Sequence, residues 1–106
     1  MKRYVLLEDK RIFNGAEIVD AGNYNGKRVI HSDDKGYFLG YMEKESDNLI
    51  DLLEVGDMVE YINNENGLVK YEIAMDNNVL LYFKKYTVVI AIWKRNGDVM
   101  RRYSVE

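Results

Sequence analysis

Residue types that do chemistry are scarce in this sequence. There is no Cys, which excludes disulfides, zinc-thiolate sites, iron–sulfur clusters and a thiol nucleophile. The single histidine, His31, shares a predicted strand face with Val29, where a partly buried structural histidine is the commoner arrangement. Ser32 follows it directly, and because neighbouring side chains on a strand diverge, the two form no nucleophile–base pair. We therefore predict that the protein is not an enzyme and uses no metal or cofactor.

Acidic residues are concentrated in the middle of the chain. The net charge is −3, but between Asp33 and Asp76 twelve acids stand against three lysines, a net −9. Carboxylates on such a segment can imitate phosphates and occupy the positive groove of a nucleic-acid enzyme, with electrostatic steering of the encounter. The alternative is a solvated acidic face that keeps a small protein soluble. The residues of this predicted partner-binding surface are Asp33, Asp34, Glu43, Glu45, Asp47, Asp51 and Glu54.

The carboxyl-terminal segment has the opposite charge. From Lys84 onward six bases stand against two acids, a net +4. A nucleic-acid site here would combine these bases with an exposed aromatic side chain, as in small barrels that bind single strands. The remaining body, residues 1–83, carries −7 and repels a polyanion. The residues of this alternative site are Trp93, Arg95, Arg101 and Arg102.

A β-hairpin is expected to present these basic residues. Asn96-Gly97 favours a two-residue turn, because both residue types tolerate positive φ. That turn places Trp93 opposite Met100 and Ile92 opposite Arg101. An exposed Trp flanked by arginines can stack on a base or anchor a protein partner. The alternative is that Trp93 and Met100 cover a second sheet.

Short apolar runs, interrupted by glycine-containing turns and free of proline, predict antiparallel strands. Alternation is clearest in Leu68–Ala74, where Val69, Tyr71 and Ile73 share one face. Tyr37–Met42 is apolar on both faces, as in a central strand. The predicted strands are Arg3–Leu7, Arg11–Asn14, Ala16–Asp20, Arg28–Ser32, Tyr37–Met42, Met58–Ile62, Leu68–Ala74, a run within Val79–Lys94, and Asp98–Val105.

Two segments have helical features. Residues 47–54 place Leu49, Leu52 and Leu53 at helical spacing, with Gly56 to end the helix. This predicts a short helix that closes one end of a barrel or sandwich. Residues 79–85 follow possible caps at positions 76–78 but precede a β-branched run, so the sequence leaves helix and strand both open there.

Length and pattern together predict the architecture. A chain of 106 residues supports one core, so we expect a single β-rich domain over residues 1–106. The expected fold is mainly β, an antiparallel barrel-like or sandwich domain with one short helix at about 47–54. Uncharged runs are too short for a secretory signal or a membrane span. We expect a cytoplasmic protein of a bacterial host, without a membrane partner.

Three segments together carry a resemblance. They are the opening KRYVLLEDKRI, the central LIDLLEVGDMVEY and the ending AIWKRNGDVMRRY, about a third of the chain. In this order they resemble small proteins encoded by phages and prophages of Gram-positive bacteria, most of them uncharacterised. Many such proteins bind and inhibit host machinery, and anti-CRISPR and other anti-defence proteins are among them. The resemblance implies a mobile-element origin and transfers no site residue.

These observations predict a non-enzymatic phage or prophage accessory protein that acts by binding another protein. In the sharper form, the partner is a host nucleic-acid-handling or defence enzyme such as a CRISPR nuclease, and the protein is its inhibitor. The alternative is a small nucleic-acid-binding β-barrel that uses the basic, aromatic hairpin. A third hypothesis is an assembly component of a phage particle, which predicts ordered homo-oligomers.

Overall fold

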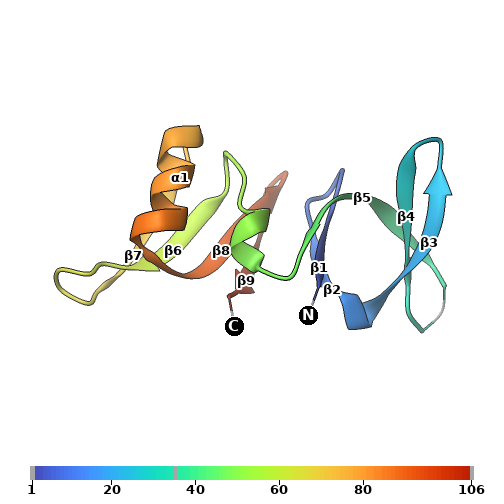
Figure 1. The fold of residues 1–106 in the computed structure, drawn as a ribbon, viewed down its shortest axis with the longest axis horizontal. Coiled ribbons are helices and arrows are strands. Elements are labelled where there is room, and N and C mark those ends of the chain that lie inside the picture. Colours follow the sequence, from blue (N-terminus) through green and yellow to red (C-terminus); the bar gives the residue numbers. More distant parts are fainter. Residues whose placement is uncertain (1, 35, 106) are drawn as a thin grey trace. The chain divides into compact units, whose positions relative to one another are not determined.

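The computed structural model describes residues 2–34 and 36–105. It divides the chain between residues 48 and 49 into two compact units, each with an antiparallel sheet (Figure 1). The prediction of a mainly β, antiparallel fold is confirmed, although each sheet is open and ends in edge strands, so the barrel form is not adopted. A single β-rich domain over residues 1–106 stays a prediction. No helix in the described residues is long and apolar enough to cross a membrane.

The first unit holds a five-stranded sheet in the order β2-β1-β5-β4-β3. A 3-10 turn, η1 at Gly15–Glu17, precedes β3. The long strand β5 lies in the middle, as its apolar residues on both faces predict. The strands are β1 (Arg3–Leu6), β2 (Ile12–Asn14), β3 (Ile18–Tyr24), β4 (Lys27–Ser32) and β5 (Phe38–Ser46).

One cluster of buried side chains lies among the strands β1, β3 and β4 of this unit. Leu6, Ile18 and Ile30 form a buried cluster, with Leu39 and other half-buried side chains packed around it. Gly40 passes close to this cluster with φ +152, and a Cβ there would lie 3.2 Å from Cδ1 of Leu6. Any larger residue at this position would therefore push on the core where β5 shifts register against β4.

The second unit holds a four-stranded sheet in the order β7-β6-β8-β9, with one α-helix packed on it (Figure 1). The edge strands are β7 and β9. The elements are η2 (Leu49–Leu52), β6 (Met58–Ile62), β7 (Val69–Ile73), α1 (Asn77–Tyr86), β8 (Val88–Asn96) and β9 (Val99–Ser104).

The short helix predicted at about 47–54 is present as the 3-10 turn η2. Its closing hydrogen bond runs from the Leu53 N–H to the Ile50 carbonyl, the i to i+3 pattern of a 3-10 turn. The helix is shorter than expected and begins at Leu49, after a local turn in which the Ser46 side chain accepts from the Asn48 N–H. Its leucines are buried, as their spacing predicts.

The segment that the sequence left open, residues 79–85, is helical and belongs to α1. Asp76 caps the helix, its Oδ1 accepting from the Val79 N–H at 2.9 Å. At the other end the Thr87 hydroxyl donates to the Phe83 carbonyl, and the chain turns into β8. Phe83 is 1% exposed and lies against the ring of Tyr61 in the sheet, with centroids 5.1 Å apart.

The register predicted for the β8–β9 hairpin is wrong. Asn96 pairs with Val99, so the turn residues are Gly97 and Asp98. Gly97 adopts φ +61 whereas Asn96 keeps a negative φ, and this favours a turn with glycine at its first central position. The shift of two residues keeps every side chain on its expected face but places Trp93 opposite Arg102.

Candidate interaction face

A buried carboxylate organises the outer face of the second unit's sheet. Glu60 of β6 is 5% exposed and accepts hydrogen bonds from Arg102 of β9 at 2.9 Å on each carboxylate oxygen. The indole N–H of Trp93 on β8 donates to the same carboxylate at 3.0 Å. These side chains meet because Trp93 is the cross-strand partner of Arg102, and Glu60 sits on the neighbouring strand with its side chain on the same face.

The electrostatics of this cluster favour the ionised carboxylate. The hydrogen bonds from Arg102 lower the pKa of Glu60, burial opposes that effect, and the Trp93 N–H adds to it. The same hydrogen bonds raise the pKa of Arg102. The bidentate geometry also fixes the orientation of both side chains.

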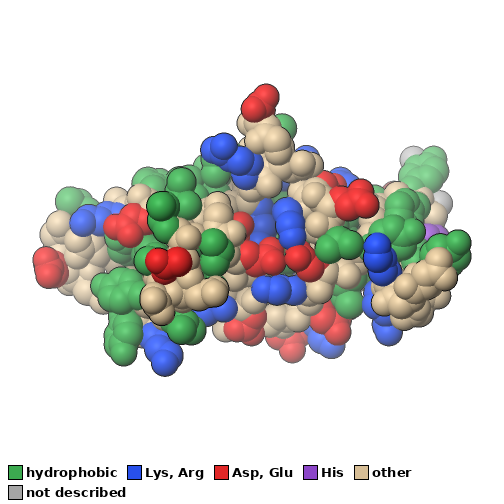
Figure 2. All heavy atoms as spheres, turned by 90° about the horizontal axis from the view of Figure 1, so that it is seen from above, with side chains coloured by type: hydrophobic (Ala, Val, Ile, Leu, Met, Phe, Trp, Pro, Cys, Tyr) green, Lys and Arg blue, Asp and Glu red, His purple; other side chains and the backbone are tan. Residues whose placement is uncertain are grey.

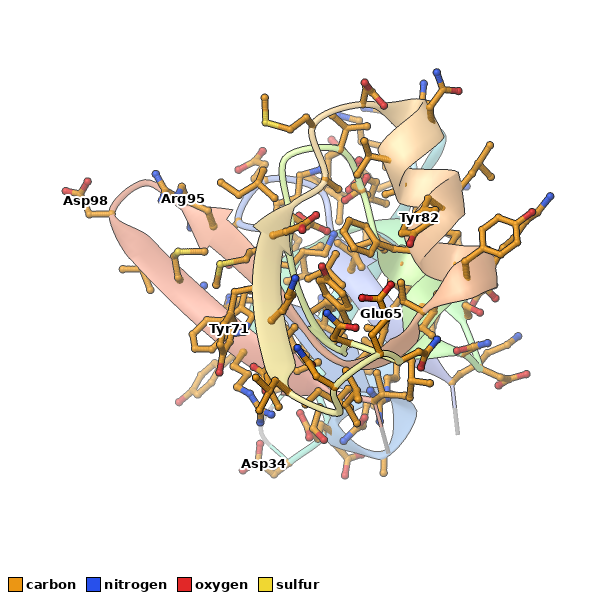
Figure 3. The ribbon with its side chains drawn as sticks, turned by 90° about the vertical axis from the view of Figure 1, so that its left-hand side faces the viewer. Asp34, Glu65, Tyr71, Tyr82, Arg95 and Asp98 are labelled. Atoms are coloured by element: carbon orange, nitrogen blue, oxygen red, sulfur yellow. The ribbon has the colours of Figure 1, made fainter. Side chains whose placement is uncertain are left out.

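Around this cluster, alternate residues of all four strands form what we call the exposed sheet face. Val69, Tyr71 and Ile73 of β7 are 47%, 56% and 51% exposed. Figure 3 looks onto β7, with Tyr71 on one side of the strand and Tyr82 of α1 on the other. With Glu60 at its centre, the face presents Met58, Val69, Tyr71, Ile73, Trp93, Arg95, Met100 and Arg102.

The composition of this face resembles that of protein-interface cores. Interface cores are enriched in aromatic residues, Met and Arg and depleted in Lys, Glu and Asp. The face contains Tyr, Trp, two Met and two Arg, and its one carboxylate, Glu60, is buried under Arg102. Figure 2 shows hydrophobic side chains reaching the surface at the end of this unit that carries α1 and β7.

The opposite face of the sheet contains a charged group that the sequence analysis missed. Lys94 is 2% exposed, and its Nζ lies 2.9 Å from Glu54 Oε1 and 2.7 Å from Asp57 Oδ2. Burial raises the pKa of Asp57, although Lys94 opposes the shift. A sequence signal existed: Lys94 lies two residues after Ile92, so the two share the buried face of β8.

The predicted acidic surface is distributed over both units. Glu43 pairs with Lys10 at 2.5 Å, Glu45 with Lys2 at 3.9 Å, and Glu54 with the buried Lys94. The remaining four acids are exposed: Asp33, Asp34, Asp47 and Asp51. The first three of these lie in the first unit and Asp51 lies in the second.

Three of the four residues of the alternative nucleic-acid site share the exposed sheet face. Trp93, Arg95 and Arg102 lie there together, with the Arg95 guanidinium 3.7 Å from the sulfur of Met100. Arg101 projects from the opposite face, where it is the cross-strand partner of Lys94. The charge of Arg102 is already balanced by Glu60, so Arg95 is the cation of this face that Glu60 does not neutralise.

The histidine considered for catalysis in the sequence analysis lies in the first unit, whereas the exposed sheet face belongs to the second. His31 is half-buried and packs edge-on against Phe38, with ring centroids 6.3 Å apart. In the described part of the chain, no group of three His, Asp or Glu side chains is arranged to hold a metal ion. An open hollow of about 320 Å³ in the second unit is lined by Tyr61, Lys70 and the two exposed tyrosines of α1.

Comparisons of the chain with protein-family models, curated proteins and solved structures found no match. The resemblance to phage and prophage proteins therefore stays a prediction.

Proposed function

We propose that this protein acts without catalysis, by binding another protein through the exposed sheet face. The observation that carries the proposal is the group of apolar and aromatic side chains around the Glu60–Arg102 pair. Monomeric proteins seldom expose such a group unless it binds something. Trp93 is held by its hydrogen bond to Glu60, so this anchor is fixed before a partner arrives and loses little entropy on binding.

The charge of the face indicates the chemistry of the partner. Arg95 is exposed at the β8–β9 turn end of the face (Figure 3), and its guanidinium donates a hydrogen bond to the Met100 sulfur at 3.7 Å. A complementary protein surface therefore has an apolar groove for Tyr71 and Ile73 and a carboxylate at its rim for Arg95. Such a rim contact contributes more to association rate and specificity than to affinity.

The biological setting of this proposal is supported by the sequence resemblance. The three segments that resemble phage and prophage proteins support an accessory protein of a mobile element. In this setting the partner is a host nucleic-acid-handling or defence enzyme, such as a CRISPR nuclease, and binding inhibits it. The exposed acids Asp33, Asp34, Asp47 and Asp51 support electrostatic steering toward the basic surface of such an enzyme.

Affinity capture from a bacterial host lysate tests the proposal with matched variants. Tyr71→Asp places a charge in the exposed sheet face, whereas Tyr82→Asp makes the same change on α1, where Tyr82 is 53% exposed. We expect wild type and Tyr82→Asp to capture the same host protein at moderate salt and Tyr71→Asp to lose it. Capture that Tyr71→Asp leaves intact, or no captured protein at low salt, would contradict the proposal.

A nucleic-acid-binding protein is the second candidate, and the shared face of Trp93, Arg95 and Arg102 favours it. Binding of a labelled single-stranded oligonucleotide distinguishes the two. The second candidate expects binding that weakens steeply with salt and is lost when Trp93→Ala and Arg95→Ala are combined. The protein-binding proposal expects no salt-dependent shift in the same series.

A further inference from the structure

We propose that two copies of this chain pair along β7, in antiparallel orientation, to form one continuous eight-stranded sheet. The feature that leads to this proposal is the edge of the second unit's sheet, where β7 is the terminal strand. All five of its residues are exposed, so neither face of the strand is covered in the described structure. An uncovered edge strand is a template for another strand.

The hydrogen bonds of β7 to β6 determine which backbone groups face outward. The Asn63 N–H donates to the Leu68 carbonyl, and the Ala74 N–H donates to the Asp57 carbonyl, each at 2.8 Å. In an antiparallel ladder the residues that bond a given neighbour alternate. The even-numbered residues of β7 therefore bond to β6, and the N–H and C=O groups of Val69, Tyr71 and Ile73 point away from the sheet.

These outward groups match a two-fold axis at Tyr71. Antiparallel pairing about this axis places Tyr71 opposite Tyr71 of the second copy and Val69 opposite Ile73 of the second copy. Every such pair joins two residues whose backbone groups both point outward, as a closely bonded antiparallel pair requires. Three pairs exchanging two hydrogen bonds each give about six bonds across the interface. The contact is isologous, so it closes at a dimer.

The charged side chains of β7 specify the same register. Lys70 stands opposite Glu72 of the second copy, and Glu72 opposite the second copy's Lys70. A slip of two residues in either direction would instead set Lys70 against Lys70 or Glu72 against Glu72, which is destabilising. Lys70 has no ion partner in the described residues, and Glu72 uses Oε1 to accept from Tyr61, which leaves Oε2 for the lysine.

The proposed contact is small. One strand of five residues per copy buries much less surface than a standard interface of about 1,600 Å². We therefore expect a reversible dimer that dissociates in the micromolar range rather than an obligate one. Because strand addition uses the edge of β7, the side chains of the exposed sheet face remain accessible, and the dimer presents two such faces.

Charge-reversal variants test this register. Lys70→Glu and Glu72→Lys each create like-charge pairs in a self-dimer, so each alone is expected to sediment as a monomer. Mixed in equal amounts, they restore opposite charges at both positions and are expected to form a heterodimer. Analytical ultracentrifugation over a micromolar to submillimolar range measures this, and Trp93 fluorescence reports whether each variant is folded. A mixture that stays monomeric, or a single variant that dimerises like wild type, would overturn the proposal.

A backbone variant tests the edge itself. Tyr71→Pro removes an N–H that points outward and makes no bond to β6, so the fold should tolerate it while the dimer weakens at least tenfold. Tyr71→Thr is the matched control, because it changes the side chain but keeps the N–H. Wild type that is monomeric throughout the range would also refute the dimer. Neither result depends on capture of a host protein, so the two proposals fail separately.

Discussion

Two ion-pair clusters occupy opposite faces of one four-stranded sheet, and they differ in which partner is buried. On the exposed sheet face Glu60 is buried but its partner Arg102 reaches solvent, with 44% of its side chain exposed. On the inner face Lys94 is itself the buried group, with Glu54 and Asp57 around it. A cation buried this way depends on its carboxylates, because isolated ions are costly to desolvate.

Replacing Lys94 by Met is expected to reduce the free energy of unfolding by about 3–5 kcal/mol, because Asp57 then stays buried without its cation. Chemical denaturation followed by Trp93 fluorescence measures the change. Lys85→Met is the control, since Lys85 is exposed on α1 and should alter the value by less than about 0.5 kcal/mol. A Lys94→Met protein as stable as the control would show that the buried pair contributes nothing.

The Glu60 cluster predicts a pH dependence of stability. The pKa of Glu60 is lower in the folded state than in the unfolded state, chiefly through its hydrogen bonds with Arg102. Its contribution is therefore fully present above the unfolded value of about 4.3 and is lost as pH falls through the folded pKa. Glu60→Gln lacks this contribution, so its unfolding free energy should fall less between about pH 5 and pH 3.

The measurement is a set of denaturation curves at several pH values. Glu65→Gln is the control, because Glu65 is exposed in the β6–β7 turn (Figure 3) and should leave the wild-type pH profile unchanged. If Glu60→Gln keeps the full acid dependence, the bond to Arg102 is not what stabilises the ionised carboxylate.

At the scale of elements, local patterns predicted the strands well. Every strand expected outside residues 79–94 is present within a few residues of its predicted bounds, because glycine turns separated clear apolar runs. The central place of β5 followed from its two apolar faces. The hairpin register was missed because Asn96-Gly97 and Gly97-Asp98 are both acceptable turn pairs, and only φ distinguishes them.

What the sequence could not reveal depends on contacts between distant residues. Trp93 and Arg102 were singled out for the basic hairpin, but their bonds to Glu60 involve a strand more than thirty residues away. The division into two units was not predicted either, because the apolar pattern locates strands but does not show which of them pair into one sheet. Side-chain alternation correctly placed Val69, Tyr71 and Ile73 together but could not show that nothing in the described residues covers them.

The N-terminal cap of α1 is expected to contribute to the stability of the fold. Asp76→Ala removes the side chain that accepts from the Val79 N–H and should lower the free energy of unfolding by about 1 kcal/mol. Asn78→Ala, two residues on, replaces an exposed residue by a better helix former and should be neutral or stabilising. Thermal unfolding by circular dichroism compares the two. Equal effects would mean that the cap does not hold the start of α1.

At the scale of the whole molecule, the arrangement is two small units in series along the chain. Each has its own sheet and its own buried side chains: the cluster of Leu6, Ile18 and Ile30 in the first, and Val59, Phe83 and Ile92 among those in the second. Units of about fifty residues bury a modest fraction of their surface and are marginally stable. A core substitution in one unit tests whether the two units unfold together.

Ile30→Ala removes a fully buried side chain from the first unit and should destabilise that unit by about 2–5 kcal/mol. Trp93, the single tryptophan, reports on the second unit, whereas far-UV circular dichroism reports on both. Because Ile30 belongs to the buried cluster of the first unit, we expect the substitution to shift the circular dichroism transition more than the Trp93 transition. Phe83→Ala in the second unit should move the Trp93 transition. If Ile30→Ala instead shifts both signals equally, residues 1–106 unfold as one cooperative domain.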